Sequence, residues 1–171
     1  MLSDKMLKEL NTQINKEMYS GYLYMAMSAH SDSLGLKGIA NWFMVQYQEE
    51  FEHASRIYNY IQEQGGKVEL LAIEKPQGEF KSPLAMFEKT LEHEKFVTKS
   101  INDLVDLAIK ENDHATQIFL QWFVTEQVEE EANASEILDK LNLIGGEGNG
   151  LFMIDKDLGS RAFTSELGEE E

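Results

Sequence analysis

Residues 37–64 read KGIANWFMVQYQEEFEHASRIYNYIQEQ, and this stretch decides the fold. Apolar side chains recur along it at alternating intervals of three and four residues, which is the spacing of a helix face packed inside a bundle. We call such a face the seam of its helix. The seam of this stretch consists of Ile39, Phe43, Gln46, Glu50, His53, Ile57 and Tyr60. The sequence therefore predicts a long helix whose apolar seam is interrupted near its middle by polar residues.

Three other stretches have the same period and lie between signals that start and stop helices. Ser3 or Asp4 can cap the first of them, and Ser82 followed by Pro83 supplies an N-cap and a first-turn proline for the third. Asp113 can cap the fourth, and a glycine pair follows its end. The predicted helices cover residues 4–33, 37–64, 82–112 and 113–142.

The connections between these helices predict how the chain is folded. The short link Leu34-Gly35 makes the first two predicted helices an antiparallel pair, whereas residues 67–81 contain Pro76 and have no helical period, as expected of a long crossover. A short, partly apolar segment at about 151–163 predicts a small C-terminal helix. We expect an all-α fold: an antiparallel four-helix bundle over about 4–142 with one long crossover and a short fifth helix, in a single domain of residues 1–171.

Polar residues interrupt the seam of each predicted helix about twelve to fifteen residues from its start. In a bundle of nearly equal antiparallel helices, these positions fall at one level, whichever way each helix runs. The interrupting residues include Glu17 in the first helix, Gln46, Glu50 and His53 in the second, Glu94 in the third, and Gln127 and Glu130 in the fourth. We therefore expect a layer of polar side chains in the middle of the core.

A layer of buried carboxylates needs compensating positive charge, and no lysine or arginine occupies a seam. A metal ion is the obvious candidate, because Glu50 and His53 are three residues apart on one helix face and can ligate one ion together. Oxygen ligands with one imidazole suit iron(II), manganese(II) or zinc. The alternative is that these glutamates face solvent or are protonated and hydrogen-bonded. Tyr24, seven residues after Glu17, could hydrogen-bond a ligand, act as a redox-active neighbour of the metal, or be a core aromatic residue.

Composition excludes several classes of function. The chain has 15 basic and 31 acidic residues, and its net charge of −16 repels nucleic acids and anionic membrane surfaces. It has no cysteine, which excludes disulfides, thiolate metal sites and thiol nucleophiles and fits a reducing compartment. There is no apolar run of about 18 residues and no signal peptide. We expect a soluble cytoplasmic protein that binds neither nucleic acid nor membrane.

The arrangement of these residues resembles the non-haem ferritins of bacteria and archaea, over nearly the whole chain. The residues that carry the resemblance are Glu17, Tyr24, Glu50 and His53 in EFEH (50–53), Glu94 in EHEK (92–95), and Gln127 and Glu130 in EQVEEE (126–131). It implies that these seven residues form a di-iron ferroxidase site. One iron would be held by Glu17, Glu50 and His53, and a second by Glu94 and Glu130, with Glu50 bridging and Gln127 close by.

The resemblance also implies a third iron site, made of Glu49, Glu126, Glu129 and Glu130. Helical spacing allows this site, because 126, 129 and 130 share one face, although the run 126–131 could also be a solvated acidic patch. We expect no haem, because Phe51 stands at the position of the haem methionine in bacterioferritins. The remaining histidines have no second ligand at metal spacing, and we expect surface or edge positions for His30, His93 and His114.

These observations predict an iron-storage protein with ferroxidase activity. It would oxidise iron(II) with dioxygen or hydrogen peroxide and keep the product as mineral inside a hollow homo-oligomer, for which the resemblance implies 24 subunits. The alternative within the same chemistry is a di-iron peroxidase or oxygenase of the rubrerythrin-like type, which would favour a second histidine motif or a cysteine-based electron-transfer domain. A third possibility is an acidic helical scaffold that binds partners and no metal.

Overall fold

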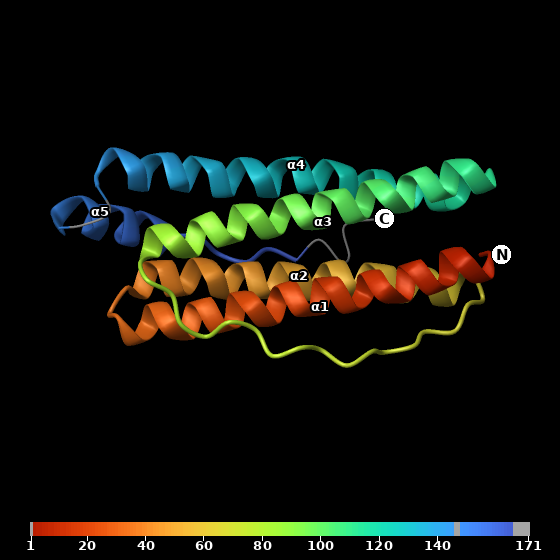
Figure 1. The fold of residues 1–171 in the computed structure, drawn as a ribbon, viewed down its shortest axis with the longest axis horizontal. Coiled ribbons are helices and arrows are strands. Elements are labelled where there is room, and N and C mark those ends of the chain that lie inside the picture. Colours follow the sequence, from red (N-terminus) through yellow and green to blue (C-terminus); the bar gives the residue numbers. More distant parts are fainter. Residues whose placement is uncertain (1, 146–147, 166–171) are drawn as a thin grey trace.

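The structure of the chain is a computed structural model that describes residues 2–145 and 148–165. Figure 1 shows a bundle of four long helices with a short fifth helix at one end. The helices are α1 (Asp4–Ser33), α2 (Lys37–Glu63), α3 (Pro83–Glu111), α4 (His114–Leu143) and α5 (Gly148–Leu158). No strand occurs in the described part of the chain. The predicted all-α bundle with a long crossover and a short C-terminal helix is thus confirmed.

Three of the long helices, α1, α3 and α4, begin directly after a residue whose side chain caps them, whereas Leu36 before α2 makes no such bond. The hydroxyl of Ser3 accepts a hydrogen bond from the amide of Met6, and that of Ser82 accepts one from Ala85. At the start of α4, the carboxylate of Asp113 accepts from the amide of Thr116 at 3.1 Å. Each cap satisfies a backbone donor that has no partner within its own helix. These caps set the register in which each seam faces the core.

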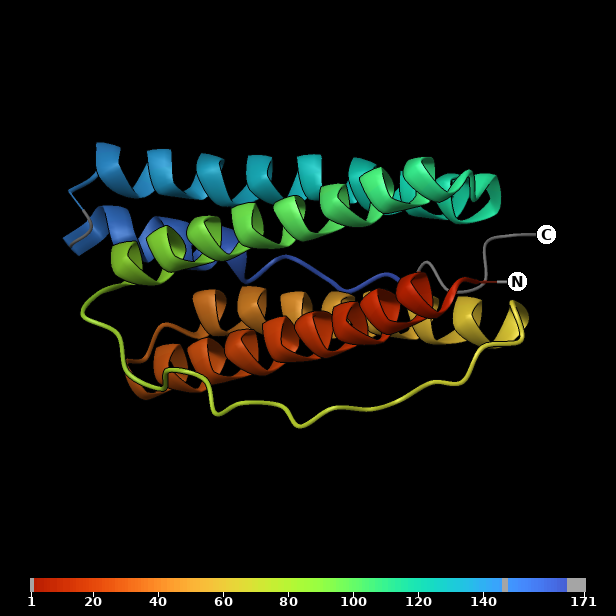
Figure 2. The same cartoon turned by 45° about the vertical axis from the view of Figure 1, so that its right-hand side comes forward.

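The two hairpins, α1–α2 and α3–α4, form the two halves of the bundle (Figure 2). The crossover between them runs along the outside of α1 for most of its length (Figures 1 and 2). Side chains of α1 hold it there: Asn11 donates to the carbonyl of Lys67 and accepts from the amide of Glu69, and Asn15 donates to the carbonyl of Ala72. The crossover therefore returns the chain to the end at which α2 began, so that α3 runs parallel to α2 and antiparallel to α1 (Figure 1).

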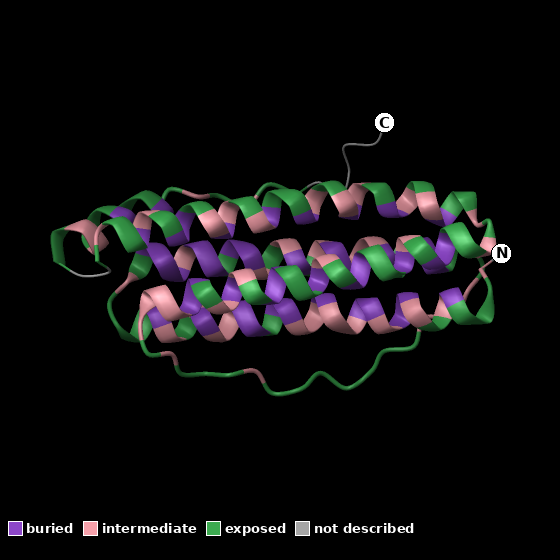
Figure 3. Cartoon of the chain, turned by 45° about the horizontal axis from the view of Figure 1, so that its top comes forward, coloured by how far each residue is buried: buried purple, intermediate pink, exposed green. Residues whose placement is uncertain are grey.

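The apolar core is divided into two clusters along the bundle axis. One is built around Met6 and Leu10 of α1, and the other around Leu23 and Met27 of the same helix. Figure 3 shows that buried residues follow the inward faces of the helices. The polar seam residues lie between the two clusters along each helix, so that apolar packing surrounds the polar layer on both sides. This placement gives the layer a low dielectric environment.

The C-terminal helix differs from the prediction in its bounds. It spans Gly148–Leu158, rather than about 151–163, because the chain leaves the helix at Gly159 and turns back along α2 (Figure 1). Ile154 and Leu158 are buried, whereas Phe152 and Met153 are each 70% exposed. The carboxylate of Asp155 accepts a hydrogen bond from the amide of Ile39, which fixes α5 at the start of α2.

Among the described residues, no helix has the length and apolarity needed to cross a membrane.

Candidate metal centre

The polar seam residues lie in the core, as the sequence predicts. Glu17, Glu50, His53, Glu94 and Glu130 are each no more than 4% exposed, although four of the five carry a carboxyl group. They come from all four long helices, at matching depth in the bundle. Burial of so many carboxyl groups in one place is unfavourable unless protons or cations neutralise them.

The first group of potential metal ligands consists of Glu17, Glu50 and His53. Each offers one ligand atom, and these three atoms lie within 4.8 Å of one another. The Oε2 atoms of Glu17 and Glu50 are buried and have no hydrogen-bond partner. Buried polar atoms without partners are rare in folded proteins. The two oxygens and the imidazole therefore fit a divalent cation, which would satisfy all of them at once.

The second group consists of His53, Glu126 and Glu130, whose ligand atoms also lie within 4.8 Å of one another. His53 belongs to both groups, so that the two potential sites adjoin at its ring. Glu130 is buried, and its Oε2 accepts a hydrogen bond from the side-chain amide of Gln46 at 2.8 Å. Two adjoining groups of this kind can hold two cations close together.

Glu94 belongs to neither group, and its carboxylate is held on the other side of the layer. Its Oε1 accepts a short hydrogen bond from the Tyr24 hydroxyl, and its Oε2 accepts one from the Gln127 amide at 3.1 Å. Gln127 also donates weakly to the carbonyl oxygen of Glu94 at 3.3 Å. The predicted residues Tyr24, Glu94 and Gln127 are therefore brought together as a hydrogen-bonded set beside the two groups of ligand atoms.

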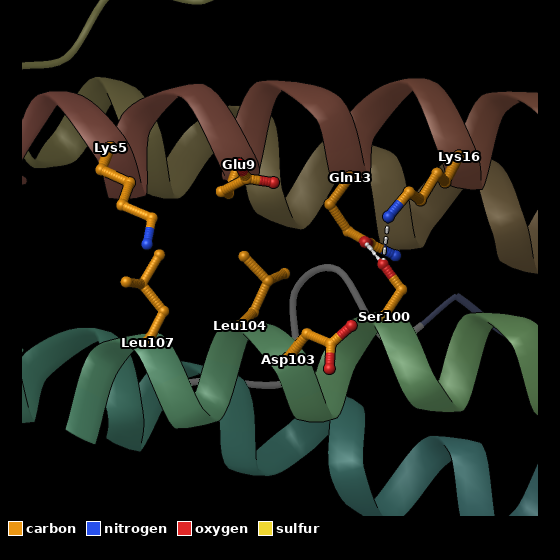
Figure 4. Close-up of a pocket in the computed structure, with 8 residues that line it drawn as sticks. All are labelled: Lys5, Glu9, Gln13, Lys16, Ser100, Asp103, Leu104 and Leu107. Atoms are coloured by element: carbon orange, nitrogen blue, oxygen red, sulfur yellow. Dashed lines mark hydrogen bonds between the residues drawn. The ribbon is translucent and has the colours of Figure 1, made fainter. Parts of the chain in front are cut away.

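A chain of polar side chains reaches Glu17 from the groove between α1 and α3, a cavity of about 230 Å³ (Figure 4). The ammonium group of Lys16 donates to the Ser100 hydroxyl, which donates to Oε1 of Gln13. The amide nitrogen of Gln13 donates to Oε1 of Glu17 at 2.8 Å. One oxygen of Glu17 is thus fixed by hydrogen bonding, while the other points into the layer without a partner. Such support orients a ligand before a metal binds.

The structure brings only part of the expected third site together. Glu126 is half-buried and Glu130 is buried, and both belong to the second group of ligand atoms. Glu129 is exposed and is not in that group. Glu49 forms an ion pair with Arg161, in which one guanidinium nitrogen lies 2.7 Å from Oε2 and 3.0 Å from Oε1. The guanidinium of Arg161, from the C-terminal segment, thus neutralises the charge of Glu49 in this structure.

One expectation from the sequence is wrong. His93 is buried, not at the surface or an edge, because its ring lies between α3 and α1. Its Nε2 is 2.8 Å from the Ser20 hydroxyl, and the ring packs against Tyr19 and Tyr24. Burial lowers the pKa of His93 to about 4, so the ring is neutral. Spacing along α3 alone does not reveal a partner that α1 supplies.

The sequence also gave no functional role to residues that support the ligands. Gln46 lies in the seam of α2, and this position was a signal that it reaches the layer. Gln13 is four residues before Glu17, a spacing that places both on one face of α1. Arg161 follows a short helix in an irregular segment, and no pattern in the sequence predicts its contact with Glu49.

Burial controls the protonation of the layer. It raises the pKa of Glu50 and Glu130 well above the usual range, and the neighbouring carboxylates raise both further. Burial also raises the pKa of Glu17, opposed by the Gln13 hydrogen bond, and it raises the pKa of Glu94 to about 7. The pKa of His53 is lowered to about 3 by burial, so its imidazole is neutral. Neutral imidazole is the form that ligates metals.

Some helical bundles bind metal ions between their helices through buried glutamates and Glu-x-x-His motifs. The buried glutamates of this chain and its motif Glu50-Phe51-Glu52-His53 place it in that class. Residues 7–144 match the family model described as the ferritin-like domain. The chain belongs to the ferritin family, and its resemblance to the bacterial and archaeal non-haem ferritins is confirmed.

Individual relatives agree with this assignment. The chain is 46% identical to a bacterial non-heme ferritin of Campylobacter jejuni, over 91% of this chain and 93% of the relative. It is 40% identical to a bacterial non-heme ferritin of Staphylococcus aureus, over 97% and 100%. A solved structure of an open pore ferritin from Archaeoglobus fulgidus is 51% identical and superposes with a TM-score of 0.94, covering 95% of this chain and 100% of that one.

Proposed function

We propose that this protein stores iron and has ferroxidase activity: it oxidises iron(II), its substrate, to iron(III) and keeps the product as mineral inside a hollow homo-oligomer. The observation that carries the proposal is the group of Glu17, Glu50 and His53, whose ligand atoms lie within 4.8 Å of one another, with the carboxyl groups of Glu94 and Glu130 buried in the same layer. The names of the relatives, non-heme ferritins, support the same function. Dioxygen or hydrogen peroxide would be the electron acceptor.

The proposed ligands divide between two iron ions. Glu17, Glu50 and His53 would hold the first, and Glu94 and Glu130 the second, with Glu50 bridging them. Because the Glu94 carboxylate is now held by Tyr24 and Gln127, it must turn toward the centre when iron binds. Two iron(II) ions supply one electron each, and one dioxygen with two protons takes up both to give hydrogen peroxide. Neighbouring ions suit this reaction because they can reduce one acceptor together.

The protonation of the layer supports substrate binding and release. Burial raises the pKa of Glu50 and Glu130, so each carboxyl binds a proton more readily than an exposed glutamate does, and iron(II) competes with protons for these oxygens. The neutral ring of His53 has a lone pair for the ion without losing a proton first. The raised pKa of Tyr24 keeps its hydroxyl protonated, and therefore able to donate to Glu94.

The surface of α5 supports assembly. Phe152 and Met153 are each 70% exposed on an 11-residue helix, and Leu143 just before it is 87% exposed. Exposed apolar groups gathered at one end of a bundle are typical of subunit interfaces. We propose that they pack between chains in the homo-oligomer, for which 24 subunits is the proposed number. The absence of cysteine suits a cytoplasmic location.

The experiment that tests the proposal is aerobic addition of iron(II) to the metal-free protein, with absorbance and particle size followed together. We expect rapid iron(III) formation within particles far larger than the 19.6 kDa chain. His53→Ala should lose the rapid phase, because both ligand groups contain His53. His114→Ala is the matched control, since His114 is exposed at the start of α4. A monodisperse monomer, or equal oxidation rates in both variants, would contradict the proposal.

A further inference from the structure

The segment that follows α5 is fixed against α2 by contacts around Arg161. Residues 159–165 run back along α2 (Figures 1 and 2). The carbonyl of Arg161 accepts a hydrogen bond from the Asn41 amide at 2.8 Å, and its guanidinium lies 5.0 Å from the ring centroid of Trp42. The side chain of Arg161 is only 23% exposed. These contacts hold the guanidinium in one place at the edge of the metal centre.

The guanidinium is linked to two carboxylates of that centre. One nitrogen donates to both oxygens of Glu49, and the other donates a short hydrogen bond to Oε1 of Gln46. The amide nitrogen of Gln46 in turn donates to Oε2 of Glu130 at 2.8 Å. Because the Arg161 bond engages the Gln46 oxygen, the Gln46 nitrogen must face Glu130. Arg161 therefore acts directly on Glu49 and through Gln46 on Glu130.

The guanidinium of Arg161 lies at the carboxylates that are expected to bind the third cation. Glu49 and Glu130 are two of the carboxylates assigned to that cation, and the guanidinium is already bonded to the first and connected to the second. The two N–H bonds from arginine occupy one lone pair on each oxygen of Glu49, and the positive guanidinium repels a metal ion that approaches the same carboxylate. The two positive charges compete for one acidic group.

We infer that Arg161 is a positioning residue that serves as an internal counter-ion of the third cation site and sets the affinity of that site. In the metal-free protein it neutralises Glu49 and orients Gln46 toward Glu130. When the third cation binds Glu49, the guanidinium leaves this carboxylate and moves away from Trp42. The inference rests on the proposed function, because it assumes the three cation sites of that proposal.

The test uses zinc(II), which does not change oxidation state, on the assembled metal-free protein. Equilibrium dialysis counts the ions bound per chain and gives the affinity of each. Tryptophan emission is followed in the Trp122→Phe variant, because the Trp122 ring packs against His53 and would itself respond to a bound ion. In this variant, which retains Trp42, we expect the third equivalent to change the emission, because the guanidinium leaves the ring. Arg161→Gln should bind the third equivalent about tenfold more tightly, the factor that corresponds to one charge-assisted contact no longer broken.

Control variants separate the geometry of Arg161 from other effects. Arg161→Lys keeps the charge but not the planar fork, so its third-ion affinity should lie between those of the parent and Arg161→Gln. Lys37→Gln removes a positive charge from an exposed ion pair with Asp32 at the start of α2, and it should leave the third affinity unchanged. Trp42→Phe should remove the contribution of Trp42 to the emission change without altering the affinity.

The outcomes distinguish failure of the inference from failure of the proposed function. If the parent binds no zinc(II) in the core and does not oxidise iron(II), the proposed function fails. If it does both, but Arg161→Gln binds the third equivalent with equal or lower affinity than the parent, the inference alone is wrong. It is also wrong if only two ions bind, or if Lys37→Gln gives the same tightening as Arg161→Gln.

Discussion

The metal-free protein should lose stability as the pH rises and Glu94 ionises in the core. Replacing Glu94 by glutamine should remove most of this loss. Glu94 is fully buried, and burial raises its pKa from 4.5 to about 7. The folded chain therefore binds a proton at Glu94 more tightly than the unfolded chain does. Stability is unaffected below about pH 4.5, falls as the pH rises through the window from 4.5 to 7, and stays lower above it.

The size of the effect follows from the width of that window. A pKa difference of about 2.5 units corresponds to about 3 kcal/mol of unfolding free energy, at 1.36 kcal/mol per unit. Glutamine stays neutral at every pH and keeps an oxygen that can accept from Tyr24, and the Gln127 amide can turn to accept from its nitrogen. Glu94→Gln should therefore match the parent near pH 4.5 and exceed its stability by about 3 kcal/mol at pH 8.

The assay is urea unfolding of both proteins between pH 4.5 and 8, with a chelator present and at one protein concentration. Only the difference between the two curves is interpreted, because the other buried glutamates titrate in both proteins. Glu94→Leu is a useful comparison, since it removes the same charge but leaves the Tyr24 hydroxyl and the Gln127 amide without an acceptor. Parallel stability curves for the parent and Glu94→Gln would refute the reasoning.

Three further predictions concern neighbouring contacts. Tyr24→Phe removes a hydrogen bond that lowers the pKa of Glu94, so the stability decline measured in urea should still begin near pH 4.5 but extend to higher pH than in the parent. Gln13→Leu should weaken zinc(II) binding in dialysis by about 10- to 100-fold, as expected when the support of a ligand is lost, and unchanged affinity would contradict this role. Gly38→Ala should lower the thermal stability by about 2 to 4 kcal/mol, because its Cβ would lie 1.5 Å from the Asp155 carbonyl oxygen, whereas Gly78→Ala should not.

The sequence alone was sufficient for the bundle and for the level of its polar layer. Helical periodicity is local, so the interval from Glu50 to His53 fixes both side chains on one face, whatever surrounds them. Caps such as Ser82 and Asp113 set where the helices begin, to within a residue or two. Because antiparallel helices of nearly equal length align their midpoints, the common depth of the interruptions could be predicted without coordinates.

Only the tertiary structure decided which partner each side chain takes. Glu94 lies in its predicted seam, yet its carboxylate bonds to Tyr24 and Gln127, which belong to other helices. His93 is buried because α1 offers Ser20 as a partner. Arg161 meets Glu49 across 112 positions of sequence, from a segment that has no period. Such contacts depend on rotamers and on the paths of separate elements, and a pattern confined to one helix carries no information about either.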